Sequence, residues 1–327
     1  MSSERLQHGL VVGKFAPLHC GHEHLIRSAL AECDRVSVLC YANPDFPAMP
    51  VRHGWLQTLF PAVDVLPAPP DPPLDTAPDA VHQAYVVATL AGWNVRPDAV
   101  YTSEPYGDGL AAALGATHRS VDPARTQHAI SGTEIRADVH GHREAMDPRV
   151  YAHFVHRVAL VGAESTGKST LAAALAAHYR TAWIEEYGRF VFEREGRTLT
   201  RAHHVEIAHG HIALEDTAIR EGRAHRFLFS DTHPLTTLWW SYLLTRGADA
   251  DLVRLADSTR ERYAVTLICG DDIEFEQDGW RSNTPARSVF QSFVLYDLDR
   301  RGLPYTVLTG TLDERLAKAT ALLDALP

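Results

Sequence analysis

Residues 158–170 read VALVGAESTGKST, and this stretch decides the fold of the second half of the chain. An apolar run is followed by a loop bounded by glycines and then by an alanine-rich run, which predicts a strand, a turn and a helix. The segment from Gly162 to Ser169 fits the pattern G-x-x-x-x-G-K-[S/T] at every fixed position. Glycines there let backbone N–H groups turn inward around phosphate oxygens, at the positive end of a helix. The stretch therefore predicts a nucleotide-binding loop.

Two side chains of this loop have specific predicted tasks. Lys168 would reach the β- and γ-phosphates of ATP, and the hydroxyl of Ser169 would ligate Mg²⁺. A glycine-rich turn without a ligand is the alternative, but a chance match in a chain of this length is on the order of one in a hundred. The residues expected to bind ATP here are Gly162, Glu164, Ser165, Thr166, Gly167, Lys168, Ser169 and Thr170.

The composition indicates a globular protein of about two domains. The chain has 327 residues, of which 45% are hydrophobic and 22% charged. Its formal net charge of −10 provides no basic field, so neither nucleic acid nor a membrane surface is expected as a partner. The longest fully apolar run, 171–177, is too short to cross a bilayer, and no N-terminal signal is present. We therefore expect a soluble, cytoplasmic protein whose four cysteines are reduced thiols.

Strands are expected to alternate with helices in both halves of the chain. The expected strands are 10–12, 35–41, 99–102, 158–161, 182–184, 227–229, 265–269 and 305–308, and the expected helices include 21–31, 81–91, 107–114 and 171–179. Residues 61–80 hold seven prolines and are expected to form a surface loop. The pattern predicts two tandem doubly wound α/β domains with parallel sheets, 1–150 and 156–327, the first Rossmann-like and the second of the P-loop kinase type.

Three later stretches indicate that the second domain is a small-molecule kinase. Asp231 ends the apolar run FLFSD, where a carboxylate can join the Mg²⁺ shell, although a helix-capping role is the alternative. IEEYGRF places Glu186, Tyr187 and Arg189 after a strand, where such kinases hold the acceptor. EQDGWRSNTPAR puts Arg281 and Arg287 in a polar loop that suits a lid over the transferring phosphate, with a solvated surface as the alternative.

The loop VVGKFAPLHCGH, residues 11–22, has no hydroxyl after Gly13-Lys14, because Phe15 stands there. His19 and His22 instead form the H-x-G-H signature of nucleotidylyltransferases, at the start of a helix where imidazoles can donate hydrogen bonds to phosphate. A zinc site and ordinary helix-start histidines are the alternatives. They are disfavoured by ISGTEIR, residues 130–136, which supplies the matching second motif. The residues expected at this second ATP site are Gly13, Lys14, Phe15, His19, His22, Ser131, Thr133 and Arg136.

The combination of GKFAPLHCGH, ISGTEIR, GAESTGKST, EEYGRFVFE, SDTHPLTT and DGWRS resembles the NadR-type bifunctional family over essentially the whole chain. That family joins a nicotinamide-nucleotide adenylyltransferase to a ribosylnicotinamide kinase. YTSEPYGDGLA, residues 101–111, and VRHGW, residues 51–55, also resemble its adenylyltransferase half. The resemblance implies Glu104, Tyr106, Arg52 and Trp55 as contacts of the pyridine nucleotide, although Trp55 is equally expected in the core.

The chain also departs from that family. Some members carry an N-terminal helix-turn-helix and repress transcription, but here the first motif begins at residue 13, so no such domain is expected. His233 stands where a second carboxylate is expected after SDT. The resemblance therefore does not say how the acidic roles are shared between Asp231 and Glu186.

The resemblance implies two reactions. ATP would phosphorylate nicotinamide riboside to nicotinamide mononucleotide, and a second ATP would adenylylate that product to NAD and pyrophosphate, both with Mg²⁺. The implied catalytic residues are His19, His22, Arg136, Lys168, Asp231 and Glu186, with Ser169 and Asp231 on the metal. The motifs identify residues that bind phosphates and not those that bind the acceptor. An enzyme that acts on another phosphorylated acceptor therefore remains an alternative, as does a nucleotide sensor without turnover. A homo-oligomer is a further expectation from the resemblance.

Overall fold

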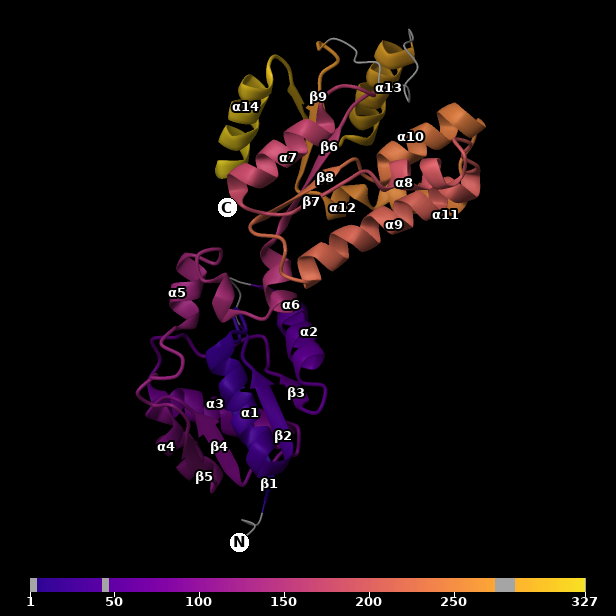
Figure 1. Ribbon diagram of the computed structural model, residues 1–327. Coiled ribbons are helices and arrows are strands. Elements are labelled where there is room, and N and C mark those ends of the chain that lie inside the picture. Colours follow the sequence, from indigo (N-terminus) through magenta and orange to yellow (C-terminus); the bar gives the residue numbers. More distant parts are fainter. Residues whose placement is uncertain (1–4, 43–46, 274–285, 327) are drawn as a thin grey trace. The chain divides into compact units, whose positions relative to one another are not determined.

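The computed structural model describes residues 5–42, 47–273 and 286–326, and the chain divides into two compact units, Met1–Tyr151 and Ala152–Pro327 (Figure 1). Each unit is built on a five-stranded sheet in which neighbouring strands are parallel. The predicted fold class, two tandem doubly wound α/β domains, is confirmed.

The sheet of the first unit has the strand order β3-β2-β1-β4-β5. Its strands are β1 Leu6–Gly13, β2 Cys33–Cys40, β3 Asp64–Pro67, β4 Ala99–Thr102 and β5 Thr117–Ser120. Val11 of β1 lies between Val38 of β2 and Tyr101 of β4, so the apolar run at the start of the chain forms the buried centre of the sheet. The chain builds outward from β1 first on one side and then on the other, which leaves a topological switch point between β1 and β4.

Helices connect these strands and cover the sheet. They are α1 Cys20–Glu32, α2 Met49–Leu59, α3 Asp79–Gly92, α4 Tyr106–Leu114, α5 Gly132–Ala137 and α6 Pro148–Tyr151. A core cluster joins Leu10 and Val100 of the sheet to Leu90 of α3 and Leu110 of α4. These apolar side chains recur at helical spacing in α3 and α4, which is why the helices lie on the sheet.

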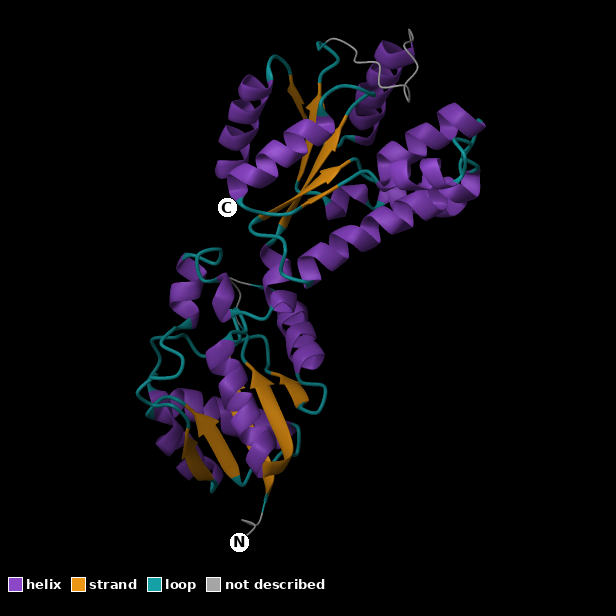
Figure 2. Ribbon diagram, in the orientation of Figure 1, coloured by secondary structure: helices purple, strands orange, loops and turns teal. Residues whose placement is uncertain are grey.

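The sheet of the second unit has the order β10-β9-β6-β8-β7, with β6 at its centre. Its strands are β6 His156–Val161, β7 Trp183–Ile184, β8 Phe227–Asp231, β9 Val265–Cys269 and β10 Thr306–Leu308. The helices are α7 Lys168–Tyr179, α8 Tyr187–Arg194, α9 Arg201–Arg220, α10 Pro234–Thr245, α11 Ala250–Asp257, α12 Thr259–Arg262, α13 Ala286–Arg301 and α14 Leu312–Asp324. In Figure 2 these helices lie on both faces of the strands, and two separate core clusters agree with that arrangement.

Two strands differ from the expectation. The proline-rich stretch 61–80 was expected to be loop throughout, but Asp64–Pro67 forms β3, which pairs with Ser37–Cys40 of β2. The strand lies at the edge of the sheet, and Pro67 stands at its last residue, where a missing N–H is tolerated. Strand β5 was not expected either, because its sequence THRS is polar and mostly exposed.

No helix in the described part of the chain is long and apolar enough to cross a membrane. The four cysteines are free thiols, and Cys33, Cys40 and Cys269 are buried.

Candidate functional site

The first unit contains a cavity of about 770 Å³ beside the carboxyl ends of β1 and β4. Gly13 of β1 and Thr102 of β4 both line it, so it lies at the switch point of the sheet, where open α/β sheets bind their ligands. The lining brings together most of the residues expected there from the sequence. These are Gly13, Lys14, Phe15, His19, His22, Glu104, Tyr106, Ser131, Thr133 and Arg136.

His19 and His22 lie against each other at the start of α1, with ring centroids 3.9 Å apart. His19 is buried and caps the helix, because its Nδ1 accepts the N–H of Gly21 at 3.2 Å. A neutral imidazole that accepts through Nδ1 carries its proton on Nε2. His19 therefore has a hydrogen-bond donor available on Nε2, and in His22 the buried Nδ1 has no hydrogen-bond partner among the described residues.

Both histidines are held in the neutral form. Burial lowers the pKa of His19 to about 4, and the nearby charges of Arg125, His128 and Arg136 add to the shift. Burial likewise lowers the pKa of His22, followed by the influence of His19. At neutral pH the pair can therefore act on a phosphate as N–H donors, while Lys14 and Arg136 supply the positive charge.

The second motif is tied directly to the first loop. Helix α5 begins with a capping box in which Ser131 and Glu134 bond each other's backbone N–H groups. This fixes the turn from which Arg136 donates to the carbonyl of Ala16 at 2.7 Å and to Thr133 Oγ1 at 2.9 Å. The two motifs, separated by more than a hundred residues, thus form one wall of the cavity.

Arg52 and Trp55 do not line this cavity. Arg52 is fully buried in α2, where Nε donates to the carbonyl of Pro47 at 2.8 Å and Nη1 donates to that of Tyr41 at 2.6 Å and to that of Lys14 at 2.5 Å. Trp55 is buried as well. The described contacts give Arg52 a supporting task, because it holds together the backbone segments that follow β1 and β2.

In the second unit the predicted nucleotide-binding loop runs from the end of β6 into α7. Gly162 has φ +142°, and a Cβ there would lie 2.6 Å from the carbonyl of Cys269, so no other residue fits without a shift. Gly167 caps α7 with φ +82°. The loop therefore turns its backbone toward the N-terminus of α7, as the motif predicts.

The side chains expected on ATP and metal meet at one point of this loop. Lys168 Nζ donates to the carbonyl of Ala163 at 2.8 Å, and Ser169 Oγ donates to Asp231 Oδ2 at the end of β8. The other oxygen of that carboxylate, Asp231 Oδ1, is buried and has no hydrogen-bond partner among the described residues. A hydroxyl and a carboxylate at a phosphate loop are the donors that Mg²⁺ takes from proteins, with phosphates and waters as its other ligands. No group of three or more His, Cys, Asp or Glu side chains suited to a metal ion occurs within the described ranges.

Glu186 precedes α8 and lies near the same point. Loss of water around its carboxyl raises its pKa, and the Asp231 carboxylate raises it further, while Lys168 opposes the shift. Tyr187 packs its ring against α9, since a Cβ added at Gly210 would lie 2.3 Å from that ring. The structure thus brings Glu186 to Asp231 and Lys168, with Tyr187 and the exposed Arg189 following it in α8.

His233, found where a second carboxylate was expected, is buried and caps α10 through Nδ1, which accepts the N–H of Thr236. Burial lowers its pKa to about 3, so it is neutral and adds no negative charge. The acidic groups available beside Ser169 and Lys168 therefore include Asp231 and Glu186, but not residue 233.

Arg281 lies outside the described residues. Arg287 was expected in a loop, but it is in the first turn of α13. Its Nη1 donates to the carbonyl of Ile273 and its Nη2 to that of Ser165, each at 3.1 Å. Arg287 therefore lies directly beside the nucleotide-binding loop.

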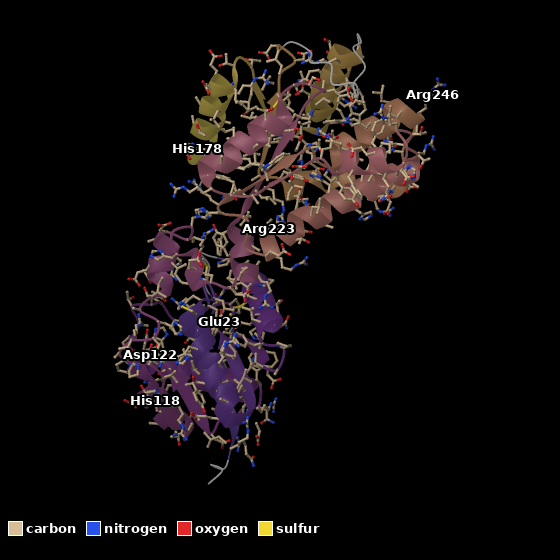
Figure 3. The ribbon with its side chains drawn as sticks, viewed as in Figure 1. Glu23, His118, Asp122, His178, Arg223 and Arg246 are labelled. Atoms are coloured by element: carbon tan, nitrogen blue, oxygen red, sulfur yellow. The ribbon has the colours of Figure 1, made fainter. Side chains whose placement is uncertain are left out.

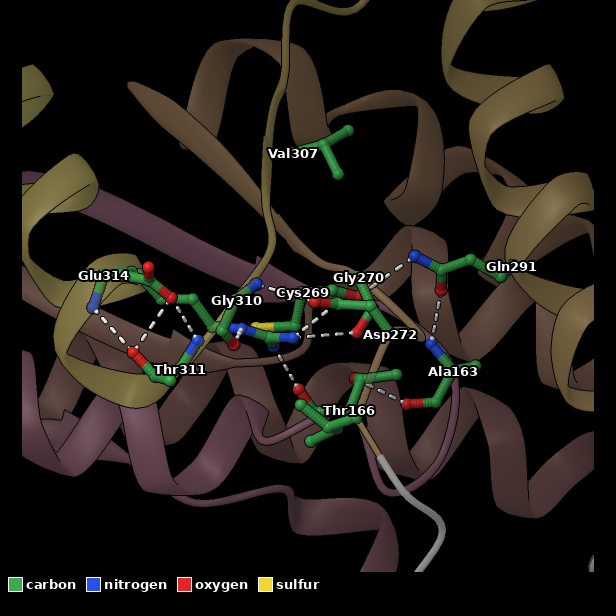
Figure 4. A network of polar contacts seen from close by, with 12 residues as sticks. Ala163, Thr166, Cys269, Gly270, Asp272, Gln291, Val307, Gly310, Thr311 and Glu314 are labelled. Atoms are coloured by element: carbon green, nitrogen blue, oxygen red, sulfur yellow. Dashed lines mark hydrogen bonds and ion pairs between the residues drawn. The ribbon is translucent and has the colours of Figure 1, made fainter.

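Two further residues support this loop and were not expected from the sequence, and Figure 4 labels one of them, Gln291. Gln291 of α13 bonds Ala163 N at 2.8 Å and the carbonyl of Cys269 at 3.0 Å. Arg315 of α14 is buried and donates to the carbonyl of Thr166 at 2.7 Å, to that of Gly310 and to Asp272 Oδ1. Both lie more than a hundred residues from the loop in the sequence, so no motif spacing predicts their contacts with it.

Comparison with known proteins gives one family match, the AAA domain family, over residues 157–315. The trifunctional NAD biosynthesis/regulator protein NadR of Escherichia coli (strain K12) is 29% identical over 321 residues, which cover 91% of this chain and 77% of that protein. The protein of the same name from Salmonella typhimurium (strain LT2) is 28% identical over 339 aligned positions, covering 96% of this chain and 82% of that protein.

Two solved structures share the fold over nearly the whole chain. A crystal structure of NadR protein in complex with NR has a TM-score of 0.72 at 22% identity, covering 98% of this chain and 96% of that one. A second, of NadR protein with NAD and AMP-PNP, has a TM-score of 0.70 at 20% identity, covering 98% and 97%. The resemblance drawn from the motifs is thereby confirmed over most of the chain.

Proposed function

Because the chain is homologous to the NadR proteins over most of its length, we propose that it is a bifunctional enzyme of NAD biosynthesis. The second unit phosphorylates nicotinamide riboside with ATP to give nicotinamide mononucleotide. The first unit transfers AMP from ATP to that product, which yields NAD and pyrophosphate. The observation that carries the proposal is that two separate groups of side chains suited to phosphate occur, His19, His22 and Arg136 in the first unit and Lys168, Ser169 and Asp231 in the second.

In the kinase step Lys168 turns from the carbonyl of Ala163 to the β- and γ-phosphates of ATP. Ser169 and Asp231 hold Mg²⁺, and the unpartnered Asp231 Oδ1 supports this assignment because a buried carboxylate oxygen without a donor calls for a cation. The ion, when bound, neutralises charge on the phosphate oxygens.

Glu186 accepts the proton of the riboside hydroxyl while the hydroxyl oxygen attacks the γ-phosphorus of ATP and ADP leaves. The raised pKa of Glu186 supports this role, since a general base works best when its pKa approaches the working pH. Tyr187 and Arg189, which follow it, contact the acceptor. Arg287, and Arg281 from the stretch outside the described residues, neutralise the charge that develops on the transferring group.

In the adenylyl step an oxygen of the mononucleotide phosphate attacks the α-phosphorus of ATP, and the bond to the bridging oxygen of pyrophosphate breaks. The neutral imidazoles of His19 and His22 donate to the phosphates, and Arg136 with Lys14 offsets the charge of the leaving pyrophosphate. Glu104 and Tyr106, which also line the cavity, contact the mononucleotide. No covalent protein intermediate is needed, so the catalysis consists of positioning and charge.

The test is one incubation of the protein with nicotinamide riboside, ATP and Mg²⁺, with products followed by chromatography over time. We expect mononucleotide to appear first and then to give way to NAD. Mononucleotide that accumulates without NAD would contradict the assignment of the first unit. No product from riboside, with NAD from supplied mononucleotide, would contradict the assignment of the kinase acceptor.

Two matched variants assign each reaction to its unit. Lys168→Ala should abolish riboside phosphorylation and spare adenylylation of supplied mononucleotide, and His22→Ala should do the reverse. If either variant, still folded by circular dichroism, lost both activities, two independent sites would be excluded.

A further inference from the structure

The segment between β5 and α5, residues 121–130, contributes to the cavity of the first unit but carries no residue of the two motifs before Ile130. Three of its polar side chains line the cavity, those of Asp122, Arg125 and His128. We call residues 121–130 the cavity loop.

Asp122 holds the cavity loop in one conformation, and Figure 3 marks its position in the first unit. Its carboxylate accepts the backbone N–H groups of Thr126 at 2.8 Å, Gln127 at 3.1 Å and His128 at 3.2 Å, and also the Thr126 hydroxyl. Arg125, inside this turn, has φ +49°, a left-handed backbone conformation that residues other than glycine rarely adopt. A local network thus holds Arg125 in an unfavourable backbone conformation, which is common where a side chain must point at a ligand.

The guanidinium of Arg125 pairs with the segment that follows β4, the strand next to β5 in the sheet. Its Nη2 lies 3.0 Å from Glu104 Oε1, in the segment after β4. Both side chains are partly exposed, 43% for Arg125 and 53% for Glu104, so the pair contributes little to stability and is easily exchanged for a stronger partner. An arginine has five N–H donors, and this ion pair uses one of them.

Arg125 and His128 line the same cavity as His19, which binds phosphate in the proposed reaction. After burial, the charge of Arg125 is the largest influence that lowers the pKa of His19, ahead of His128 and Arg136. Arg136 already donates to Ala16 and Thr133. The cavity therefore holds a cation beside His19 whose present partner, Glu104, is a surface carboxylate.

We propose that Arg125, assisted by His128, binds the pyrophosphate portion of ATP, and that it releases Glu104 when it does so. This inference rests on the proposed adenylyl transfer and adds a pair of residues that neither motif contains. A di- or triphosphate offers several charged oxygens to the guanidinium fork, whereas Glu104 offers one carboxylate. The exchange also frees Glu104 for the mononucleotide, so ATP prepares the second substrate's site.

The variants are Arg125→Gln and Arg125→Lys, with Arg119→Gln as the matched control. Arg119 also pairs with a partly exposed glutamate, Glu32 at 3.4 Å, but it does not line the cavity. With supplied mononucleotide we measure KM for ATP, and in reverse, with NAD, we measure KM for pyrophosphate. Both should rise about tenfold or more in Arg125→Gln, as expected for the loss of a hydrogen bond between charged groups. KM for the mononucleotide and for NAD should stay within about twofold, since neither carries the β- and γ-phosphates.

Arg125→Lys should recover part of the loss because it keeps the charge, and Arg119→Gln should match the unaltered protein. A fall in kcat with no change in KM for ATP and pyrophosphate would overturn the proposal. So would an equal rise in KM for all four substrates, because that pattern marks a cavity loop that has lost its structure.

Failure of the proposed function can be told apart from failure of this inference. If the unaltered protein forms no NAD, the proposed function has failed, and measurements of nucleotide binding then test the role of Arg125. In Lys168→Ala, which weakens the other nucleotide site, added Arg125→Gln should reduce the affinity for ATP about tenfold and leave that for AMP unchanged. Equal effects on the two nucleotides, or none, would refute the role of Arg125.

Discussion

Replacing Arg315 by methionine tests whether the nucleotide-binding loop of the second unit is held from α14. The methionine keeps most of the stem but removes four hydrogen bonds, to the carbonyls of Thr166, Gly310 and Gly270 and to Asp272 Oδ1. The Arg315 side chain is 4% exposed, so the hydrogen bond to Thr166 at 2.7 Å alone is worth about 1.5–3 kcal/mol. Asp272 is 37% exposed and is partly resolvated, which discounts its share. We expect the free energy of unfolding of the second unit to fall by about 3 kcal/mol.

Urea unfolding followed by tryptophan fluorescence measures this change, because the buried Trp239 reports on the second unit. For a unit of this size a loss of about 3 kcal/mol moves the midpoint down by roughly 1 M. Arg260→Met is the matched control. Arg260 also donates to two carbonyls, those of Arg301 and Gly302, but it is exposed, and its loss should cost less than about 1 kcal/mol. If the two variants differed by less than about 1 kcal/mol, burial of the Arg315 contacts would not be what stabilises the loop.

Three further expectations follow from the same geometry. Glu186→Gln should lower kcat of the proposed riboside phosphorylation by a factor of about 10² to 10⁴. It should also remove an acidic limb of the pH profile, in which activity rises with pH through a pKa raised above the usual range of a glutamate. An unchanged limb would assign the base to another residue. Burial lowers the folded-state pKa of His19 to about 4, so the contribution of His19 to the stability of the first unit is present above pH 6.5 and is lost as the pH falls toward 4. Denaturation midpoints measured between these pH values should therefore depend less on pH in His19→Asn than in the unaltered protein. Gly162→Ala should destabilise the second unit by roughly 1–3 kcal/mol in thermal unfolding, since its Cβ would meet the carbonyl of Cys269, and Gly54→Ala, which meets nothing within 4 Å, is the control.

Several inner strands could be predicted closely from the sequence, although β1 begins four residues before the expected 10–12. Strands β4 and β9 have the expected bounds, 99–102 and 265–269, because strands buried on both faces read as continuous apolar runs. The edge strands β3 and β5 could not be predicted in this way. The first is hidden in a run of prolines and the second is polar, since an edge strand needs no apolar face on both sides.

The site residues divide along similar lines. His19 and His22 lie at a fixed spacing in one motif, and Lys168 and Ser169 lie at a fixed spacing in another. Each motif alone therefore predicts its pair. Arg125 and Arg315 meet their sites through the tertiary fold, and an isolated arginine in a loop or helix looks like any surface residue. The sequence likewise gave no reason to expect that Arg52 would be enclosed by backbone carbonyls rather than lie in the cavity.

The strand order of the second unit has a consequence for how the chain acquires its shape during synthesis. Strand β6 is the first strand of that sheet to leave the ribosome, yet both of its neighbours, β8 and β9, emerge much later, and α14 emerges last. The first unit is complete by Tyr151, so it can fold while the rest is still being translated. The phosphate loop after β6 must instead wait, unsupported, until Gln291 and Arg315 have been made. A nonsense mutation just before the codon of Gln291 would therefore impair the proposed riboside phosphorylation and spare the proposed adenylyl transfer, although the affected loop is encoded in full.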